Sequence, residues 1–259
     1  MQESSWKYKR IINRALYSLR GSLFTLKIIK NVIFYIRLVT RKAQQVKPDL
    51  SVEKIYSENG KYLYIANPKV ATRSVIDYLT KFDKGNIAYK NLSLGELFKK
   101  HPKIMSYYKF SFVRNPWART YSCWVDKITN QNKFCDIIII SRFKGLYPDM
   151  PFPEFVNWLS TDEGQDKFAD RHWMSQSKLL EFESGDTQSV FIGKLENIEN
   201  DFKLVARKLS IGPVILPVLN KTQISSLAYR DHYTDNLKEI IARRYKEDIK
   251  RYNYFFEQD

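Results

Sequence analysis

A short loop between a predicted strand and a predicted helix concentrates positive charge and hydrogen-bond donors. In YLYIANPKVATRSVIDYL, residues 62–79, the turn is Asn67-Pro68-Lys69-Val70-Ala71-Thr72-Arg73-Ser74. Lysine supplies a mobile ammonium, arginine a planar fork, and threonine and serine supply hydroxyl donors. The first N–H groups of a helix also lack intrahelical partners, and the helix dipole is positive there. This combination predicts a phosphate or sulfate cradle, and the alternative is a solvated helix start capped by Thr72 or Ser74.

A second loop has the same strand–turn–helix form. In KFSFVRNPWARTYSCW, residues 109–124, Arg114 ends the strand and Pro116 stands near the first helical position, where proline is favoured. Ser122 follows Arg114 by eight residues and is expected to face back toward the turn. The two side chains could clamp a second phosphate, or Arg114 could be a salt-bridged structural residue and Ser122 a packing residue. Two cradles at adjacent strand ends indicate a ligand with anionic groups at both ends.

The motif G-x-x-x-x-G-K-[ST] of nucleoside-triphosphate-binding loops is absent from the sequence. Its absence disfavours an ordinary ATPase or kinase. The chain has two cysteines, Cys123 and Cys135, and three histidines, His101, His172 and His232. Their spacing fits neither a disulfide framework nor a zinc site, so we expect no bound metal and a reducing compartment.

The net charge of +15 is concentrated at the N-terminus. Residues 1–47 contain 11 Lys or Arg and one acid, Glu3, so they carry +10 and leave +5 for the other 212 residues. Apolar residues recur in this arm at steps of three and four, which predicts a basic amphipathic helix. Its uncharged runs are too short to span a bilayer. We expect it to bind an anionic membrane surface, with packing on the body or on a second subunit as the alternative and nucleic acid as a remote third.

Strands and helices alternate in the body, which we take to be residues 48–259 after a boundary near Pro48. We expect strands at 52–58, 61–66, 107–113 and 189–196, and helices at 72–82, 117–128, 134–140, 152–160, 197–210 and 234–253. Such alternation predicts an α/β domain with a central parallel sheet flanked by helices on both faces. In such a sheet the ligand lies at the carboxyl ends of the strands, where both loops are found.

Several segments together resemble the carbohydrate sulfotransferases that use 3′-phosphoadenosine 5′-phosphosulfate (PAPS). The similar segments are PKVATRS, FVRNPWARTYSCW, ADRHWMSQS, FIGKLENIENDF, LPVLNKT, YRDHY and YKEDIKRYNY, and they cover about residues 52–256. The resemblance implies a P-loop-NTPase-like sulfotransferase fold. It also implies transfer of a sulfuryl group from PAPS to a hydroxyl of a glycan or glycolipid, without a metal.

The resemblance assigns roles to the two loops. The first loop would hold the 5′-phosphosulfate through Lys69, Thr72, Arg73, Ser74 and the backbone of Val70 and Ala71. The R-x7-S element, Arg114 with Ser122, would hold the 3′-phosphate. Lys69 would stabilise the leaving phosphate oxygen during in-line transfer. A loop containing Asn220, Lys221 and Thr222 would close over the donor.

The ADRHWMSQS segment, residues 169–177, resembles the acceptor side of the family. His172 is the first candidate for the general base, because an imidazole titrates near neutral pH. His232 is the second candidate, and Asp170 and Glu196 are possible carboxylate bases. Trp173 could stack on a sugar ring, and Gln176 belongs to the same acceptor-binding segment. The alternative for His172 and Trp173 is that they only pack and hydrogen-bond.

The N-terminal arm separates this chain from Golgi members of that family, which carry a membrane-spanning anchor. A basic amphipathic arm instead suggests a bacterial-type cytoplasmic enzyme, peripheral on the inner face of the membrane. Two other functions remain open. One is a nucleotide-dependent kinase or another phosphate-transfer enzyme, and the other is a non-catalytic basic membrane-binding protein. The oligomeric state stays open, and no nucleic-acid partner is expected.

Overall fold

The computed structural model describes residues 52–90, 92–129, 142–180, 190–212 and 229–257. The elements are, in chain order, β1 (Glu53–Ser57), β2 (Tyr62–Ala66), α3 (Thr72–Phe82), β3 (Ala88–Lys90), α4 (Leu94–Lys100), η1 (Pro102–Ser106), β4 (Tyr108–Val113), α5 (Pro116–Cys123), η2 (Trp124–Ile128), α7 (Phe152–Ser160), η3 (Asp162–Gly164), α8 (Gln176–Leu179), β5 (Val190–Lys194), η5 (Leu195–Asn197), α9 (Ile198–Lys208), η6 (Arg230–His232), α10 (Asp235–Arg244) and α11 (Lys246–Tyr252). Strands and helices alternate as predicted, so this part of the chain is an α/β unit.

The described strands form one sheet in the order β3-β1-β2-β4-β5. Strands β2, β4 and β5 run parallel, whereas β1 pairs antiparallel with β2 and β3. The predicted parallel sheet is therefore correct for the half that carries both loops and wrong for the other half. Only residues 58–61 join β1 to β2, and so short a connection forms a hairpin. The Asn59-Gly60 pair in this turn is a known hairpin signal.

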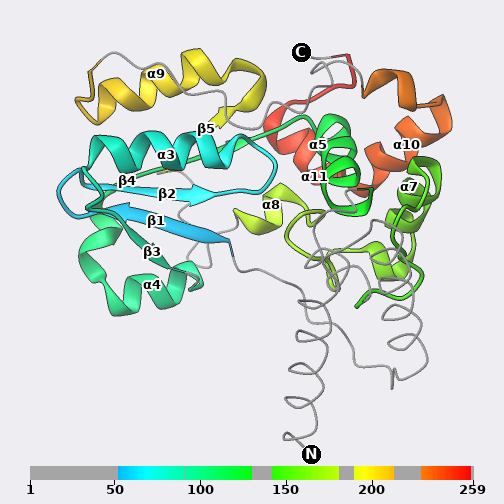
Figure 1. Cartoon of the computed structure of the whole chain (residues 1–259), viewed down its shortest axis with the longest axis horizontal. Coiled ribbons are helices and arrows are strands. Elements are labelled where there is room, and N and C mark those ends of the chain that lie inside the picture. The colour runs from blue at the N-terminus through cyan, green and yellow to red at the C-terminus, as the bar shows by residue number, and fades with distance from the viewer. Residues whose placement is uncertain (1–51, 91, 130–141, 181–189, 213–228, 258–259) are drawn as a thin grey trace, which may run out of the picture.

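Strand β2 lies at the centre of the sheet and is buried on both faces. Tyr62 and Tyr64 belong to a cluster that includes residues of α3 and α9. Leu63 and Ile65 belong to a second cluster, which includes residues of α4 and of the other helices. Figure 1 shows α3 and α9 over one face of the sheet and α4 against the opposite face. Helices therefore cover both faces, as the alternation of elements predicts.

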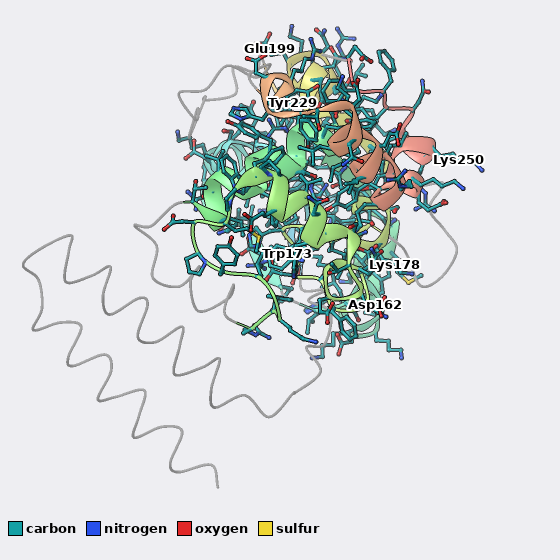
Figure 2. The ribbon with its side chains drawn as sticks, turned by 90° about the vertical axis from the view of Figure 1, so that its right-hand side faces the viewer. Asp162, Trp173, Lys178, Glu199, Tyr229 and Lys250 are labelled. Carbon is teal, nitrogen blue, oxygen red and sulfur yellow. The ribbon has the colours of Figure 1, made fainter. Side chains whose placement is uncertain are left out.

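A group of helices packs beyond the carboxyl ends of the parallel strands. Helices α5, α7, α10 and α11 lie together on one side of Figure 1, and Figure 2 looks onto that side. Their buried residues, among them Trp117, Phe155, Leu237 and Ile241, belong to the larger core cluster. The loops that follow β2 and β4 thus run from the sheet toward these helices.

Two predicted helices are interrupted. The predicted helix over 117–128 is the α-helix α5 followed by a π-helical turn, η2, in which Thr129 N donates to Trp124 O at 3.1 Å. The predicted C-terminal helix divides at Tyr245 into α10 and α11. The predicted helices over 72–82 and 152–160 match α3 and α7, and β3 is a short strand that sequence patterning did not reveal.

Some predictions fall outside the described residues. They are the amphipathic arm over 1–47 with its boundary at residue 48, the helix over 134–140, and the loop containing Asn220, Lys221 and Thr222. Over the described ranges, no helix combines the length and the apolar character that crossing a membrane requires.

A buried carboxylate fastens the short helix α8 to α11. Asp248 is fully buried, and its two oxygens accept hydrogen bonds from the backbone N–H groups of Gln176 and Ser177, each at 2.7 Å. Helix α8 has only four residues, so it has little stability of its own. The contact therefore fixes the helix start that carries Gln176, whose side chain reaches the strand ends described below.

We expect Asp248→Ala to destabilise the fold by roughly 2–4 kcal/mol, because it leaves two buried N–H groups without their charged acceptor. Urea unfolding followed by tryptophan fluorescence would measure the change. The control is Glu247→Ala, which alters the exposed neighbour on α11 and should change the free energy of unfolding by less than about 0.5 kcal/mol. Equal effects of the two substitutions would contradict this role for Asp248.

Candidate active site

The first loop, residues 67–74, connects the end of β2 to the start of α3. Val70 is fully buried and anchors the loop in the core. Lys69 and Ala71 on either side have positive φ angles of 72° and 57°, although neither is glycine. Left-handed conformations at such residues cost of the order of 1–3 kcal/mol each and cluster at functional sites. The fold therefore holds this loop in a conformation that its sequence does not favour locally.

The start of α3 is not capped as a solvated helix start would be. Ala71 is the N-cap residue, no side chain caps it, and no acidic residue lies in the first turn. Thr72 donates its hydroxyl proton to Asn67 O and closes the loop. Ser74 is buried in the same turn, whereas Arg73 is exposed. The alternative of a Thr or Ser cap is thus wrong, and the first turn keeps its positive end.

Lys69 reaches out of this loop to an aspartate of the π-helical turn. Its Nζ lies 3.2 Å from Asp126 Oδ2, and its side chain is only 14% exposed. Burial lowers the pKa of Lys69, and the neighbouring Asp126 partly opposes that shift. The ammonium is therefore poorly hydrated and would gain from a second anionic partner.

Arg114 follows β4 and lies against the first loop. Its Nη1 donates to Lys69 O at 3.5 Å. Burial lowers the pKa of Arg114, and Glu196 opposes this. Glu196 itself accepts hydrogen bonds from Asn115 N at 2.7 Å and from Tyr254 Oη at 3.0 Å. The carboxylate is therefore occupied in holding the turn after β4, and the prediction that it could be a general base is not favoured.

Ser122, the other half of the R-x7-S element, is partly buried in the last turn of α5. The helix begins at Pro116, as the sequence indicates, and Asn115 caps it by accepting from Trp117 N at 3.1 Å. Asn115 also donates to Phe255 O at 2.9 Å, which ties the turn to the C-terminal segment. The start of α5 is thereby fixed beside Arg114.

A second buried arginine connects the first loop to the segment that contains His172. Arg119 is 3% exposed, and its guanidinium donates to three carbonyl oxygens: Pro68 O at 3.4 Å, Met174 O at 2.8 Å and Arg171 O at 3.1 Å. A fork of fixed geometry that bonds several carbonyls sets the spacing of the chains it joins. Sequence reasoning missed Arg119, although its place inside the second loop was a signal.

His172 forms a dyad with Asp170. Its Nδ1 lies 2.5 Å from Asp170 Oδ1, which also accepts from His172 N at 2.9 Å. This contact makes Nδ1 the protonated nitrogen and leaves Nε2 to take up a proton. Burial lowers the pKa of His172, Asp170 opposes the shift, and the nearby Lys127 and Arg171 add to it. The imidazole is therefore neutral near pH 7, as a general base requires.

The segment around His172 is held by Arg244 at the end of α10 and by Tyr245, which follows it. Arg244 Nη2 lies 2.6 Å from Asp166 Oδ1, and Tyr245 Oη donates to Trp173 O at 2.7 Å. Trp173 is 1% exposed and packs against Phe143, with ring centroids 4.7 Å apart. Trp173, labelled in Figure 2, is thus a core residue, and the prediction that it stacks on a sugar is wrong for this structure.

Gln176 is also a core residue rather than an acceptor-binding one. It is fully buried, and its Oε1 accepts from Asn67 Nδ2 at 3.0 Å and from Arg114 N at 2.9 Å. Its Nε2 donates to Arg114 O at 2.8 Å. The prediction of direct substrate contact is corrected: Gln176 joins the ends of β2 and β4 and positions both loops.

His232 is the second candidate for the general base, and Cys123 is a thiol at the end of α5. His232 is exposed, and its Nε2 lies 2.9 Å from Tyr121 Oη, on which its ring stacks. Cys123 is buried, and burial raises the pKa of its thiol to about 12, so it is no nucleophile. The described residues contain no cluster of three or more His, Cys, Asp or Glu side chains placed to hold a metal ion.

The arrangement can bind an extended dianion and take a proton beside it. Lys69 and Arg114, both desolvated, stand at the carboxyl ends of neighbouring parallel strands, next to the positive ends of α3 and α5. The His172–Asp170 dyad is joined to the same loop through Arg119. Such a site suits transfer of an anionic group to a hydroxyl.

Comparisons with known proteins identify the family. A DNA ligase of Acanthamoeba polyphaga mimivirus is 26% identical over 225 residues, which is 76% of this chain and 33% of that protein. The chain thus spans about a third of this relative, whose name therefore assigns no activity here. No solved structure matches the chain. The profile described as "Sulfotransferase family" matches residues 53–255, which contain both loops and the dyad. This chain therefore belongs to the sulfotransferase family.

Proposed function

We propose that this sulfotransferase moves a sulfuryl group from PAPS to a hydroxyl of a glycan or glycolipid. The observation that carries the proposal is the contact between Arg114 Nη1 and Lys69 O, at 3.5 Å, which brings two desolvated cations from different loops together. PAPS carries anionic groups at both ends, so one molecule would neutralise both cations. The donor set is basic and contains hydroxyls and backbone N–H groups, which fits phosphate and sulfonate oxygens.

In this mechanism Lys69, Arg73 and the first turn of α3 bind the 5′-phosphosulfate, and Arg114 with Ser122 binds the 3′-phosphate. The S–O bond to the leaving phosphate oxygen breaks as the acceptor oxygen attacks in line. Lys69 stabilises the negative charge that develops on the leaving oxygen. His172 Nε2 takes the acceptor proton, and Asp170 stabilises the imidazolium that forms.

The acceptor class, the membrane contact through residues 1–47 and a location on the cytoplasmic face of the membrane remain parts of the proposal. A glycan or glycolipid is favoured by the resemblance to carbohydrate sulfotransferases in the segments quoted above. Membership of the sulfotransferase family speaks against the kinase and against a non-catalytic membrane protein. The first experiment below separates these alternatives, because each predicts a different ligand.

Adenosine 3′,5′-bisphosphate should bind the whole 259-residue chain with micromolar affinity, measured by calorimetry. Arg114→Ala should weaken this binding about 10- to 100-fold, since it removes charge-assisted hydrogen bonds. The matched control is Arg207→Ala, on the exposed face of α9, which should leave the affinity unchanged. A melting curve for each variant would confirm that it is folded.

Adenosine 5′-monophosphate tests the role of the 3′-phosphate. If it binds wild type as tightly as the bisphosphate does, the PAPS proposal is wrong. Tight binding of ATP that requires Mg²⁺ would then support the kinase, and binding only to anionic vesicles would support the membrane protein.

His172→Ala should lower the turnover of PAPS about 10²- to 10⁴-fold while leaving bisphosphate binding intact, because the base contacts only the acceptor side. Hydrolysis of PAPS, in which water takes the place of the acceptor, provides the assay. Unchanged hydrolysis in this variant would remove His172 from the mechanism.

The pH profile gives an independent check of the dyad. Burial holds the pKa of His172 below its ordinary value, so wild-type activity should fall only as the pH drops below about 6.5. Asp170→Asn removes the carboxylate that raises this pKa, so the acid limb should move to still lower pH as the maximal rate decreases. A limb that moves to higher pH would contradict the assignment.

A further inference from the structure

The C-terminal segment, residues 253–256, follows α11 and lies along the turn between β4 and α5. It belongs to no helix or strand, and contacts with other parts of the fold hold it. Tyr254 is 4% exposed whereas Phe255 is 55% exposed, so one ring points into the protein and the next toward solvent. Phe255 O accepts a hydrogen bond from Asn115 Nδ2 at 2.9 Å, and Phe256 packs against Trp117, with ring centroids 5.7 Å apart. The segment is thus fixed against the start of α5.

Glu196 joins the C-terminal segment to the same turn. It lies in η5, directly after β5, and its Oε1 accepts from Asn115 N at 2.7 Å while its Oε2 accepts from Tyr254 Oη at 3.0 Å. Burial and the Glu196 carboxylate raise the pKa of Tyr254, so the hydroxyl stays protonated and keeps donating. Lys194 Nζ lies 4.4 Å from the centre of the Tyr254 ring, a cation–π contact that fixes the ring. One carboxylate therefore connects three segments that are distant in the sequence.

Arg114 stands directly before Asn115, at the point where these contacts meet. Gln176 bonds Arg114 N and Arg114 O, and Glu196 bonds Asn115 N, so three successive backbone groups are fixed. The side chain is less constrained. A guanidinium has five N–H donors, and among the described residues that of Arg114 makes one hydrogen bond, to Lys69 O at 3.5 Å. The turn therefore holds its backbone rigidly and leaves donors of the guanidinium to a ligand.

We propose that Glu196 and Tyr254 are positioning residues of the donor site, which fix the turn after β4 so that Arg114 distinguishes a 3′-phosphate from a free 3′-hydroxyl. This inference rests on the proposed function and adds residues that it does not contain. The planar fork of an arginine bonds two phosphate oxygens only in a narrow range of orientations, so selectivity depends on where its backbone is held. Both oxygens of Glu196 are bonded to the scaffold, and the residue acts on the ligand only through Arg114.

Tyr254→Phe removes only the hydroxyl and keeps the ring beside Lys194. Its affinity for adenosine 3′,5′-bisphosphate, measured by calorimetry on the whole chain, should fall about 10-fold, by analogy with residues that orient a metal-binding side chain. Its affinity for adenosine 5′-monophosphate should change less than twofold, because that ligand lacks the phosphate that Arg114 binds. A purely structural role for Tyr254 would lower the melting temperature and leave the ratio of the two affinities unchanged.

The matched control is Tyr147→Phe, which breaks another hydrogen bond between a tyrosine and a glutamate. Tyr147 Oη donates to Glu154 Oε2 at 2.5 Å on the exposed surface, so this variant should alter neither affinity. A double variant tests whether Tyr254 acts through the arginine. Adding Tyr254→Phe to Arg114→Ala should weaken bisphosphate binding no further, whereas losses that multiply would make the two residues independent and contradict the proposal.

Two substitutions of Glu196 separate the reach of its side chain from its charge. Glu196→Asp keeps the charge but is one methylene shorter, so it loses the span between Asn115 N and Tyr254 Oη, and bisphosphate affinity should fall about 10-fold. Glu196→Gln keeps the length and an oxygen for Asn115 N, so its affinity should stay within threefold of wild type. The reverse order would make Glu196 an electrostatic residue and overturn the proposal. This pair also decides the question if Tyr254→Phe does not fold.

The outcomes separate this inference from the proposed function. If wild type prefers the bisphosphate to the monophosphate and Arg114→Ala loses that preference, but Tyr254→Phe and Glu196→Asp keep it, the inference is wrong and the function stands. If wild type shows no such preference, the proposed function fails and the inference fails with it. An equal loss of affinity for both nucleotides in Tyr254→Phe would indicate a general disturbance of the site, which also contradicts the proposal.

Discussion

The buried amide of Gln176 is the interaction on which the two loops depend. It joins Asn67, at the end of β2, to both backbone groups of Arg114, at the end of β4. The fully buried amide of Gln176 thus bonds the side-chain N–H of Asn67 and both the N–H and the C=O of Arg114. Asp248 then fixes the start of α8, which carries Gln176. The strand ends are thereby held at a fixed spacing before any ligand is present, which is the preorganisation that an anion site needs.

The electrostatics of the site follow from how the ends of β2 and β4 are packed. Lys69 and Arg114 are desolvated by the packing around the strand ends, and burial lowers the pKa of each. Asp126 raises the pKa of Lys69 and Glu196 raises the pKa of Arg114, but both pKa values stay below their ordinary range. Glu196 also accepts hydrogen bonds from Asn115 and Tyr254. A folded protein tolerates poorly compensated cations where they have a function, because an anionic ligand restores the balance. The positive φ angles at Lys69 and Ala71 also cost local stability, and such strained residues cluster at functional sites.

The sequence predicted the parts of this arrangement that depend on local pattern. The positions of both loops, the α/β alternation and the start of α5 at Pro116 all follow from strand and helix signals. What it did not reveal depends on contacts between distant segments. The sequence pattern places Gln176 and Trp173 among the acceptor residues, because one sequence does not tell a buried polar or aromatic residue from an exposed one. The π-helical turn that brings Asp126 to Lys69 has no local signature, and the strand pattern does not predict the antiparallel pairing of β1, although Asn59-Gly60 is a hairpin signal.

The first loop and the His172–Asp170 dyad come from different parts of the fold, and the buried Arg119 lies between them. The sheet supplies the donor loop, whereas the segment between η3 and α8 supplies the dyad, so the distance between leaving group and base is set by tertiary packing rather than by one element. Arg119 bonds Pro68 O in the loop and Arg171 O and Met174 O around His172, and so fixes that distance with one rigid group. In-line transfer is sensitive to displacements of about 1 Å. A guanidinium that is fully enclosed and bonded to backbone therefore serves this reaction better than a flexible surface contact would.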